Sequence, residues 1–446
     1  MLDQLVRALD DRILSDPTLD KSQFEKLIAL QRELGLVYGD RPTCPFLRPH
    51  IISRTEYDTV ARAASIIASA VERLVNHALL DDELLGAFGL TARETQMARI
   101  DPGYSRLCVS SRLDAYVSGS DFKFFEYNAE TPAGVGDQMQ LEKVLFGLAH
   151  MHEFLSERKH WRPEPHARLL SALLDAYRDW GGEAERPRIA IVDWKGVSTE
   201  SEFRILQDYF LAQGCETIIA DPGELSFDGS RLRVGGFAID IVYKRVVIHE
   251  FLERCDDNHP LARAYEQRRI CMVNSFRTKV GHKKNVFAIL SDAAYEYLFT
   301  PEEIAVFHRH IPWTRRVAGG QTTFAGSAHD LLDLIRRERD RFVLKPNDDY
   351  GGHGVFLGWE TSPDDWEGAI ALALARPYVV QERVSMTKHS ITSFSDRVHA
   401  EEVFIDFNPF LFNNEVEGAL IRLSSSSLLN VTSGGGQTAL LVLEDM

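Results

Sequence analysis

The sequence has few cysteines, and none of their spacings is typical of a metal site or a redox pair. No two of them form a CxxC motif, and they are the scattered residues Cys44, Cys108, Cys215, Cys255 and Cys271. An odd, dispersed set argues against a disulfide framework and against a cysteine zinc site. We therefore expect free thiols in a reducing compartment, the cytoplasm.

Long apolar runs and an excess of basic residues are also missing. No stretch approaches the roughly 20 apolar residues of a membrane helix, and the first residues, MLDQLVRALDDRILSDP, are amphipathic and acidic, so we expect no signal peptide. The formal net charge of -16 disfavours binding to nucleic-acid phosphate or to an anionic membrane. The sequence does not indicate an oligomeric state.

A P-loop (GxxxxGK[ST]) is absent, as is a convincing Ser-His-Asp or Cys-His set. What is present is a globular composition, with 446 residues of which 44% are hydrophobic and 26% charged. Periodicity predicts an α/β (α+β) fold in four parts. These are a helical region (1–100), a strand hairpin with following helices (101–185), a small parallel α/β domain (186–275) and a glycine-punctuated strand region (276–446).

The hairpin carries the strongest chemical pattern, in the segment FKFFEYNAETPAG. Residues two apart on a strand share a face, so Glu126 and Asn128 converge, and a turn near Gly119 brings Asp114 of the preceding strand alongside. Their oxygens are ligands that magnesium prefers, and Arg112 on the same face could hold a phosphate. The alternatives are an ordinary solvated strand face, or a rival metal pair in FIDFNPF formed by Asp406 and Asn408.

Two further segments favour phosphate binding. In LKPNDDYGGHGV, Lys345 ends a strand before a glycine-rich loop whose backbone N–H groups could approach phosphate oxygens. The basic cluster GHKKN, with Lys284, lies at a helix start. The alternatives are a simple turn and a solvated helix terminus. The strand YVVQERV ends in Gln381 and Glu382, which could contact a nucleoside, although an ordinary edge strand is the alternative.

These residues resemble a known family, the circularly permuted ATP-grasp proteins, and are similar to the synthetase domain of glutathionylspermidine synthase. The resemblance rests on FFEYNAETPAG with its upstream Arg-x-Asp strand, and on VSTESEFRILQDYFLAQG, IDIVYKRV, VNSFRTKVGHKKNVFAIL and GALIRLSSSSLLNVTSGGG in the same order. It spans residues 100–446. Glu130 stands where the family signature has aspartate. The permutation places the metal hairpin before the α/β domain and the phosphate-binding segments after it.

The resemblance implies ATP and magnesium, with two metal ions, and assigns roles to particular residues. The implied metal ligands are Asp114, Glu126 and Asn128. The implied contacts of the transferred phosphoryl group are Arg112 and Arg422. The implied ATP contacts are Lys284, Lys345, Gly351, Gly352, Gly354, Gln381 and Glu382.

The predicted function is an ATP-dependent carboxylate–amine ligase that forms an amide through an acyl phosphate. Its partners would be a small-molecule or peptide carboxylate and an amine, neither of which the sequence identifies. Two alternatives use the same phosphate-handling residues. One is a phosphotransferase on the same fold, and the other is a non-catalytic nucleotide-binding protein.

Overall fold

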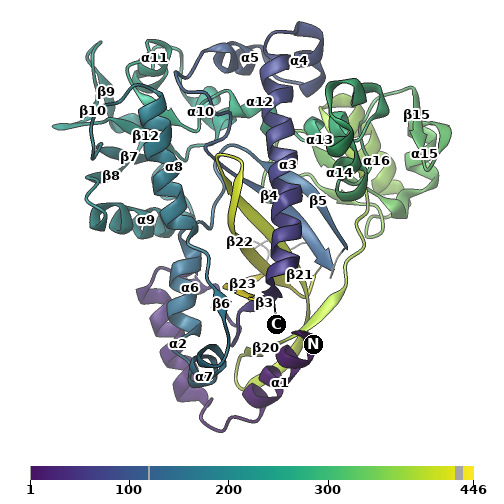
Figure 1. Ribbon diagram of the computed structural model, residues 1–446. Coiled ribbons are helices and arrows are strands. Elements are labelled where there is room, and N and C mark those ends of the chain that lie inside the picture. The colour runs from purple at the N-terminus through teal and green to yellow at the C-terminus, as the bar shows by residue number, and fades with distance from the viewer. Residues whose placement is uncertain (1, 119–120, 427–434, 446) are drawn as a thin grey trace.

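The computed structural model describes residues 2–118, 121–426 and 435–445 and is organised around a six-stranded antiparallel sheet (Figure 1). The order is β23 (Gly436–Thr438), β22 (Glu415–Ser424), β21 (Val398–Phe412), β4 (Ser110–Ser118) and β5 (Asp121–Asn128), and β20 (Lys388–Phe394) pairs with the far part of β21. The predicted hairpin is therefore formed by β4 and β5. Its turn near Gly119, and residues 427–434 of the C-terminal block, lie outside the described residues.

Helices make up most of the first hundred residues, as predicted: α1 (Leu2–Leu14), α2 (Lys21–Glu33), α3 (Arg54–Ala78), α4 (Asp82–Phe88) and α5 (Ala92–Arg99). The long helix α3 begins with a capping box, in which Ser53 and Glu56 satisfy each other's backbone N–H groups. Its alanine-rich face packs on β21 and β22, and it runs along the central sheet in Figure 1. None of the described helices has the length and apolar character needed to cross a membrane.

A parallel sheet lies at one side of the central sheet (left in Figure 1), in the order β13 (Cys271–Val273), β12 (Ile241–Lys244), β7 (Ile189–Val192), β8 (Thr217–Ala220). Strands β7, β12 and β13 are buried along their whole length and mostly apolar, which is typical of a parallel sheet covered on both faces, and the edge strand β8 is partly buried. The covering helices are α8 (Pro165–Asp179), α9 (Glu200–Ala212), α10 (Ile248–Arg254) and α11 (Pro260–Glu266), and a small antiparallel sheet, β9 (Leu225–Phe227), β10 (Leu232–Val234) and β11 (Phe237–Ala238), follows β8.

Between the hairpin and this sheet, the segment 137–155 has a periodicity that predicts one continuous helix, but it forms two. They are α6 (Asp137–Leu145) and α7 (Ala149–Ser156), separated at Gly147 in the sequence FGL. The break follows from glycine's cost within a helix and from a cap at Leu148 with extended backbone.

A second antiparallel sheet lies on the opposite side (right in Figure 1), in the order β14 (Thr314–Arg316), β19 (Tyr378–Glu382), β17 (Phe342–Pro346), β18 (Phe356–Leu357). Its own core includes α15 (Leu331–Arg337) and α16 (Pro363–Ala375). Joining and flanking elements are α12 (Thr278–His282), α13 (Asn285–Leu290), α14 (Pro301–His310), β15 (Gln321–Phe324) and β16 (Ser327–Asp330). The edge-strand alternative for YVVQERV is wrong, because β19 is paired on both sides.

The two ends of the chain are joined by a small three-stranded sheet. β24 (Leu440–Leu443) lies between β3 (His50–Ser53), to which it is parallel, and β6 (His160–Trp161). The labels N and C are close together in Figure 1. The predicted mixed α/β fold is confirmed, whereas the circular permutation and the four domain boundaries stay predictions.

Candidate functional site

A cavity of about 550 Å³ lies where the central sheet, the parallel sheet and the second antiparallel sheet meet. That volume is in the range of ligand pockets. The predicted residues on its wall are Arg112, Asp114, Glu126, Asn128, Lys284, Lys345, Gly351, Gly352, Gln381, Glu382 and Arg422. Gly354 belongs to the same loop but is not on the wall. Residues distant in sequence thus share one site.

The hairpin register brings the predicted oxygen ligands together. Asp114 is paired with Glu126, and Arg112 with Asn128, across the β4–β5 ladder. The Asn128 Nδ2 donates to Asp114 Oδ1 over 3.1 Å, and the Arg112 Nε donates to the same oxygen over 2.7 Å. A bulge follows Asp114, so that Ala115 is opposite Phe124. The hairpin therefore presents its polar side chains to the cavity as one group.

Arg422 of β22 joins this group from the other side. Its Nη2 lies 2.9 Å from Asp114 Oδ2 and 2.6 Å from Asp406 Oδ2. Burial would raise the pKa of Asp114, but Arg112 and Arg422 outweigh it and hold that pKa below its usual value. Burial raises the pKa of Asp406 to about 6 despite the same arginine. Both carboxylates are therefore mostly ionised at neutral pH, and Asp406 is the first of the two to take up a proton as the pH falls.

The rival pair from FIDFNPF is arranged differently. Asp406 is on the cavity wall, whereas Asn408 is fully buried and uses its Nδ2 to donate to Asp406 Oδ1 over 2.6 Å. The Asn408 Oδ1 accepts from the Ala115 backbone N–H over 3.2 Å. Both ends of this amide are thus used inside the sheet, the oxygen toward β4 and the nitrogen toward β21 and β22, and of the pair only Asp406 faces the cavity.

The two predicted phosphate lysines enter the cavity together because the chain segments that carry them are bonded. The Asn347 carbonyl accepts from the Lys284 N–H, and the Asn347 Oδ1 accepts from the Asn285 N–H, each over 2.9 Å. Lys284 Nζ lies 3.0 Å from Glu126 Oε1, and Lys345 Nζ donates to Gln381 Oε1 over 2.7 Å. Burial lowers the pKa of Lys345 to about 8.

The glycine-rich loop contacts both sides of the cavity. Gly351 and Gly352 have φ of 69° and 79°, a left-handed conformation that glycine adopts readily. Before them, the Asp349 carbonyl accepts from Lys284 Nζ over 2.8 Å, and the Tyr350 hydroxyl donates to Glu250 Oε1 over 2.6 Å. Glu250 belongs to α10, so the loop connects the second antiparallel sheet to the parallel-sheet part. Mobility of the loop without nucleotide stays a prediction.

Gln381 and Glu382 line the cavity, but much of their hydrogen-bonding capacity is already used. The Gln381 amide accepts from Lys345 and donates to Thr314 Oγ1 over 3.0 Å. The Glu382 N–H donates to the Trp313 carbonyl, and its carboxylate lies 3.2 Å from Arg341. The wall continues past them through residues 383–386, which we had not predicted.

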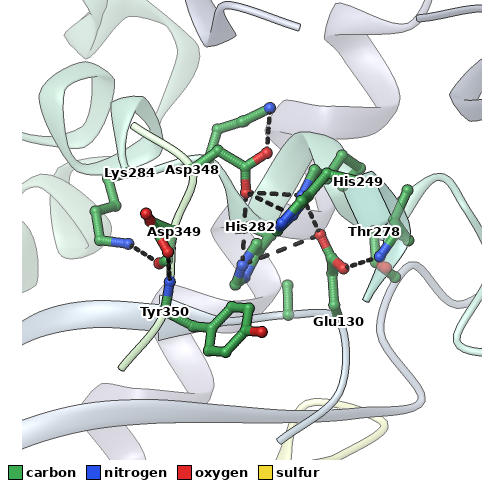
Figure 2. Close-up of polar contacts among 12 residues, drawn as sticks. Glu130, His249, Thr278, His282, Lys284, Asp348, Asp349 and Tyr350 are labelled. Carbon is green, nitrogen blue, oxygen red and sulfur yellow. Dashed lines mark hydrogen bonds and ion pairs between the residues drawn. The ribbon is translucent and has the colours of Figure 1, made fainter. Parts of the chain in front are cut away.

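A buried network of ion pairs underlies the loop (Figure 2). Lys279 Nζ lies 2.7 Å from both Glu130 and Asp348, and Lys283 Nζ lies 2.6 Å from Asp348 and 2.9 Å from Glu94. In Figure 2 the labelled carboxylates of Glu130 and Asp348 point toward His282, at 4.0 Å each. Lys279 is fully buried and its pKa is raised, because the two carboxylates outweigh burial.

Three members of this network, Glu130, His282 and Asp348, have ligand atoms within 4.8 Å of one another, as a metal site would require. The Lys279 ammonium already lies between the two carboxylates and supplies the positive charge that they need. We therefore interpret the group as an ion-pair network that fixes the root of the loop, rather than as a metal centre.

Sequence reasoning missed this network and the charged residues that the parallel sheet contributes to the wall. The signals were present but weak: Lys279 and Lys283 are four residues apart on one helical face, and Asp348 directly precedes the glycines. On the other wall, Asp193 follows strand β7 and Arg245 follows strand β12. Single charged residues after buried strands are common, so nothing in the sequence distinguishes these.

No family model matches the chain. A protein of Frankia casuarinae named "Putative glutamate--cysteine ligase 2-2" is 24% identical over 447 residues, covering 92% of this chain. A second relative, a protein of Frankia alni named "Putative glutamate--cysteine ligase 2-3", is 24% identical over 272 residues, which cover 56% of this chain. The chain spans 48% of the first relative's length and 29% of the second's.

Among solved structures, a glutathione synthetase-like effector from Globodera pallida (GSS30, apo form) aligns with a TM-score of 0.56 at 13% sequence identity. The alignment covers 96% of this chain and 98% of that one. At this identity the likeness establishes a shared fold. It does not identify glutathionylspermidine synthase as a relative, and that resemblance stays a prediction.

Proposed function

We propose that this chain is an ATP-dependent carboxylate–amine ligase with a circularly permuted ATP-grasp fold, which forms an amide through an acyl phosphate. One observation carries the proposal. Two arginines, two lysines and three oxygen-bearing side chains of the hairpin converge in a single cavity beside a glycine-rich loop. Such a set is suited to handling phosphate charge.

The hairpin side chains fit magnesium as a donor set. Asn128 donates to Asp114 through its nitrogen, and its oxygen has no hydrogen-bond partner among the described residues. Glu126, with a side chain 24% exposed, pairs with Lys284 and faces the cavity. Carboxylate and amide oxygens are hard ligands that suit this ion. When bound at Asp114, Glu126 and Asn128, two magnesium ions would neutralise charge on the ATP phosphates.

The cationic residues have separate tasks in this proposal. Lys284 and Lys345 bind the phosphates that remain on ADP, and Arg112 with Arg422 orients the phosphoryl group that moves to the substrate carboxylate. The loop with Gly351, Gly352 and Gly354 covers the site and excludes water, which would otherwise hydrolyse the acyl phosphate. Gln381 and Glu382 lie beside the nucleoside, together with residues 383–386.

The substrate class follows from the relatives only as a starting point. Both curated relatives are named as glutamate–cysteine ligases, so L-glutamate is the first carboxylate to test and L-cysteine the first amine. An acidic chain with a net charge of -16 is compatible with a cationic amine.

Hydroxylamine trapping tests the proposal. An acyl phosphate is electrophilic at carbon, so hydroxylamine should convert it to a hydroxamate that forms only with ATP, magnesium and a carboxylate substrate. L-Glutamate and a panel of amino acids and short peptides serve as carboxylates, with ADP release measured in parallel. A stable phosphorylated product without hydroxamate would establish the phosphotransferase instead. Nucleotide binding without any ADP release would establish the non-catalytic alternative.

A further inference from the structure

The parallel-sheet end of the cavity has a chemistry of its own, which the phosphate-binding residues do not use. Asp193 follows β7 and Arg245 follows β12, so both stand at the carboxyl ends of parallel strands, the edge at which ligands commonly bind in such sheets. Glu250 reaches the same wall from α10. Two carboxylates thus line this end.

This end adjoins the phosphate end through one short turn. Arg112 Nη1 donates to the Ala133 carbonyl over 3.0 Å, and Arg245 Nη1 donates to the Pro132 carbonyl over 2.6 Å. The turn 131–133 also lines the cavity, so it separates the two ends by a few residues. A carboxyl group phosphorylated at Arg112 would therefore lie beside the end that contains Asp193.

Two polar groups at this end are left for a ligand. Asp193 Oδ1 accepts from the Trp194 N–H over 2.8 Å, whereas Oδ2 has no hydrogen-bond partner among the described residues. Arg245 is only 4% exposed, and its buried Nε donor is likewise unpartnered within the described part of the chain. An acceptor and a donor that the protein itself leaves unused are typical of a binding site.

The charged groups around Asp193 set its protonation. Burial raises its pKa to about 6, and Glu250 acts in the same direction, while Arg245 and Lys244 oppose the rise. Tyr350, whose hydroxyl donates to Glu250, lines the same cavity, and Glu202 lies 3.5 Å from Arg245. A carboxylate with such a pKa is mostly ionised at neutral pH yet is a stronger base than an exposed aspartate.

We propose that Asp193 accepts the proton of the amine substrate, a primary amine bound in its cationic form between Asp193 and Glu250. The assignment rests on the proposed ligase function. The Asp193 carboxylate takes one proton from the ammonium, which frees the nitrogen lone pair. The neutral amine attacks the acyl-phosphate carbon, the C–N bond forms, and the C–O bond to phosphate breaks with its electron pair. The leaving phosphate takes the second amine proton, and Asp193 releases its own to solvent.

Two kinds of nucleophile distinguish proton acceptance by Asp193 from a purely structural role of this residue. Hydroxylamine is mostly uncharged at neutral pH and needs no base, whereas L-cysteine and glycine present an ammonium group. Because hydroxylamine itself becomes protonated in weak acid, hydroxamate formation is expressed per concentration of its free base at each pH. For the wild type and each variant, we divide the rate of amide formation with these two amines by the rate of hydroxamate formation. The carboxylate is one that gives a hydroxamate in the wild type, and the ratio is measured at several pH values around the Asp193 pKa. The variants are Asp193→Asn, Asp193→Glu and, as a matched control on the exposed face of α9, Asp208→Asn.

In the wild type, the ratio of amide to hydroxamate should fall as the pH drops through about 6, because Asp193 becomes protonated. Asp193→Asn should lower the ratio by roughly 10²–10⁴-fold and remove that pH dependence. Asp193→Glu should keep part of the wild-type ratio, and Asp208→Asn should have the same ratio as the wild type. Should Asp193→Asn not fold, as judged by thermal unfolding, the wild-type pH profile decides.

Other outcomes overturn the assignment. An unchanged ratio in Asp193→Asn, or an equal loss of amide and hydroxamate, excludes proton acceptance by Asp193 while leaving the ligase proposal intact. The absence of amide from both amines, with hydroxamate present, excludes the ammonium site. If the wild type forms no hydroxamate with any carboxylate, the ligase proposal itself fails, and the role of Asp193 fails with it.

Discussion

Glu126 shows how the charges of individual residues in this cavity are compensated by neighbouring side chains before any ligand binds. Burial would raise its pKa, but Lys284 and Lys345 outweigh burial and keep that pKa below its usual value. The carboxylate is therefore ionised and held by lysines that the proposal assigns to phosphate. Binding of magnesium and ATP would exchange these ion pairs for lysine–phosphate and carboxylate–metal contacts, with little change in net charge at the site.

The first prediction concerns this carboxylate. Glu126→Gln keeps the size of the side chain but removes its charge, so it should lower magnesium-dependent ADP release by roughly 10²-fold and raise the magnesium concentration needed for half activity. Titration of magnesium at fixed ATP measures both quantities. Asp208→Asn is the control, and thermal unfolding checks the fold. An unchanged magnesium requirement would remove Glu126 from the metal site.

The second prediction concerns Lys345, whose pKa burial lowers to about 8. The side chain is a cation below that pH and neutral above it, and only the cation attracts phosphate. The affinity for Mg-ATP should therefore weaken as the pH rises through about 8, by at most about tenfold per pH unit. Calorimetric titration at several pH values measures the effect.

Lys345→Arg tests the cause, because a guanidinium stays charged in this range. Its affinity should change much less with pH, whereas Lys388→Arg, at an exposed lysine outside the cavity, should follow the wild type. An identical pH dependence in Lys345→Arg and the wild type would show that another group is responsible.

At the scale of elements, α12 is tied to the loop and to the end of the hairpin by Lys279. This helix has only five residues, Thr278–His282, and it is stabilised by buried ion pairs rather than by its own propensity. The ion pairs fix Asp348 at the root of the loop, and Asn347 fixes the adjacent residue to α13. The tip of the loop is then the part that is left to move.

The third prediction is that Lys279→Met destabilises the fold by about 3–5 kcal/mol at neutral pH, because it leaves the buried Glu130 and Asp348 carboxylates short of a partner. Urea-induced unfolding measures the difference, and Lys388→Met at an exposed position is the control. A loss within about 0.5 kcal/mol, as is usual for surface positions, would contradict the role assigned to the network.

The same variant has an expected pH dependence. In the wild type, Lys279 with His282 and Lys244 overcomes burial and lowers the pKa of Glu130 to about 2, so its contribution to stability is present above its usual pKa and is lost as the pH falls toward 2. Without Lys279, burial raises the pKa of Glu130, and its protonation removes the cost of an unpaired buried charge. The difference in the free energy of unfolding between Lys279→Met and the wild type should therefore become smaller as the pH is lowered from about 7 to about 5.

Several elements were predictable from the sequence because their determinants are local. The alternation in FKFFEYN predicts a strand face with Glu126 and Asn128 together, and apolar runs such as IAIV predict buried parallel strands. The break between α6 and α7 was missed because a single glycine is a weak signal. The interior position of β19 was missed because pairing partners are set by long-range packing, which a strand's own residues do not encode.

At the scale of the whole molecule, the site depends on contacts between segments far apart in the chain. Arg422 bonds to Asp114 although the two residues are 308 positions apart in the sequence. Lys284 bonds to Asn347 although part of the second antiparallel sheet lies between them in the sequence. Arg112 could be assigned to phosphate from its position on the strand face, whereas the sequence could place Arg422 there only through a family resemblance. Asp193 belongs to no motif, and although Glu130 and Lys279 lie in segments that carry the resemblance, only the folded chain shows that they pair with Asp348.

The last prediction concerns how the two ends of the chain hold the molecule together. Leu441 is fully buried in β24 and is paired with Ile51 of β3, so the C-terminal strand completes a core that begins near the N-terminus. Leu441→Ala should lower the free energy of unfolding by about 2–5 kcal/mol, the range for a leucine removed from a close-packed core. Leu80→Ala, at a leucine that is 91% exposed, is the control and should change stability little. Urea-induced unfolding measures both variants, and hydrogen exchange should show reduced protection in β3 and β6 together with β24. Loss of protection confined to β24 would mean that the terminal strand is an appendage and that the core near the N-terminus is stable without it.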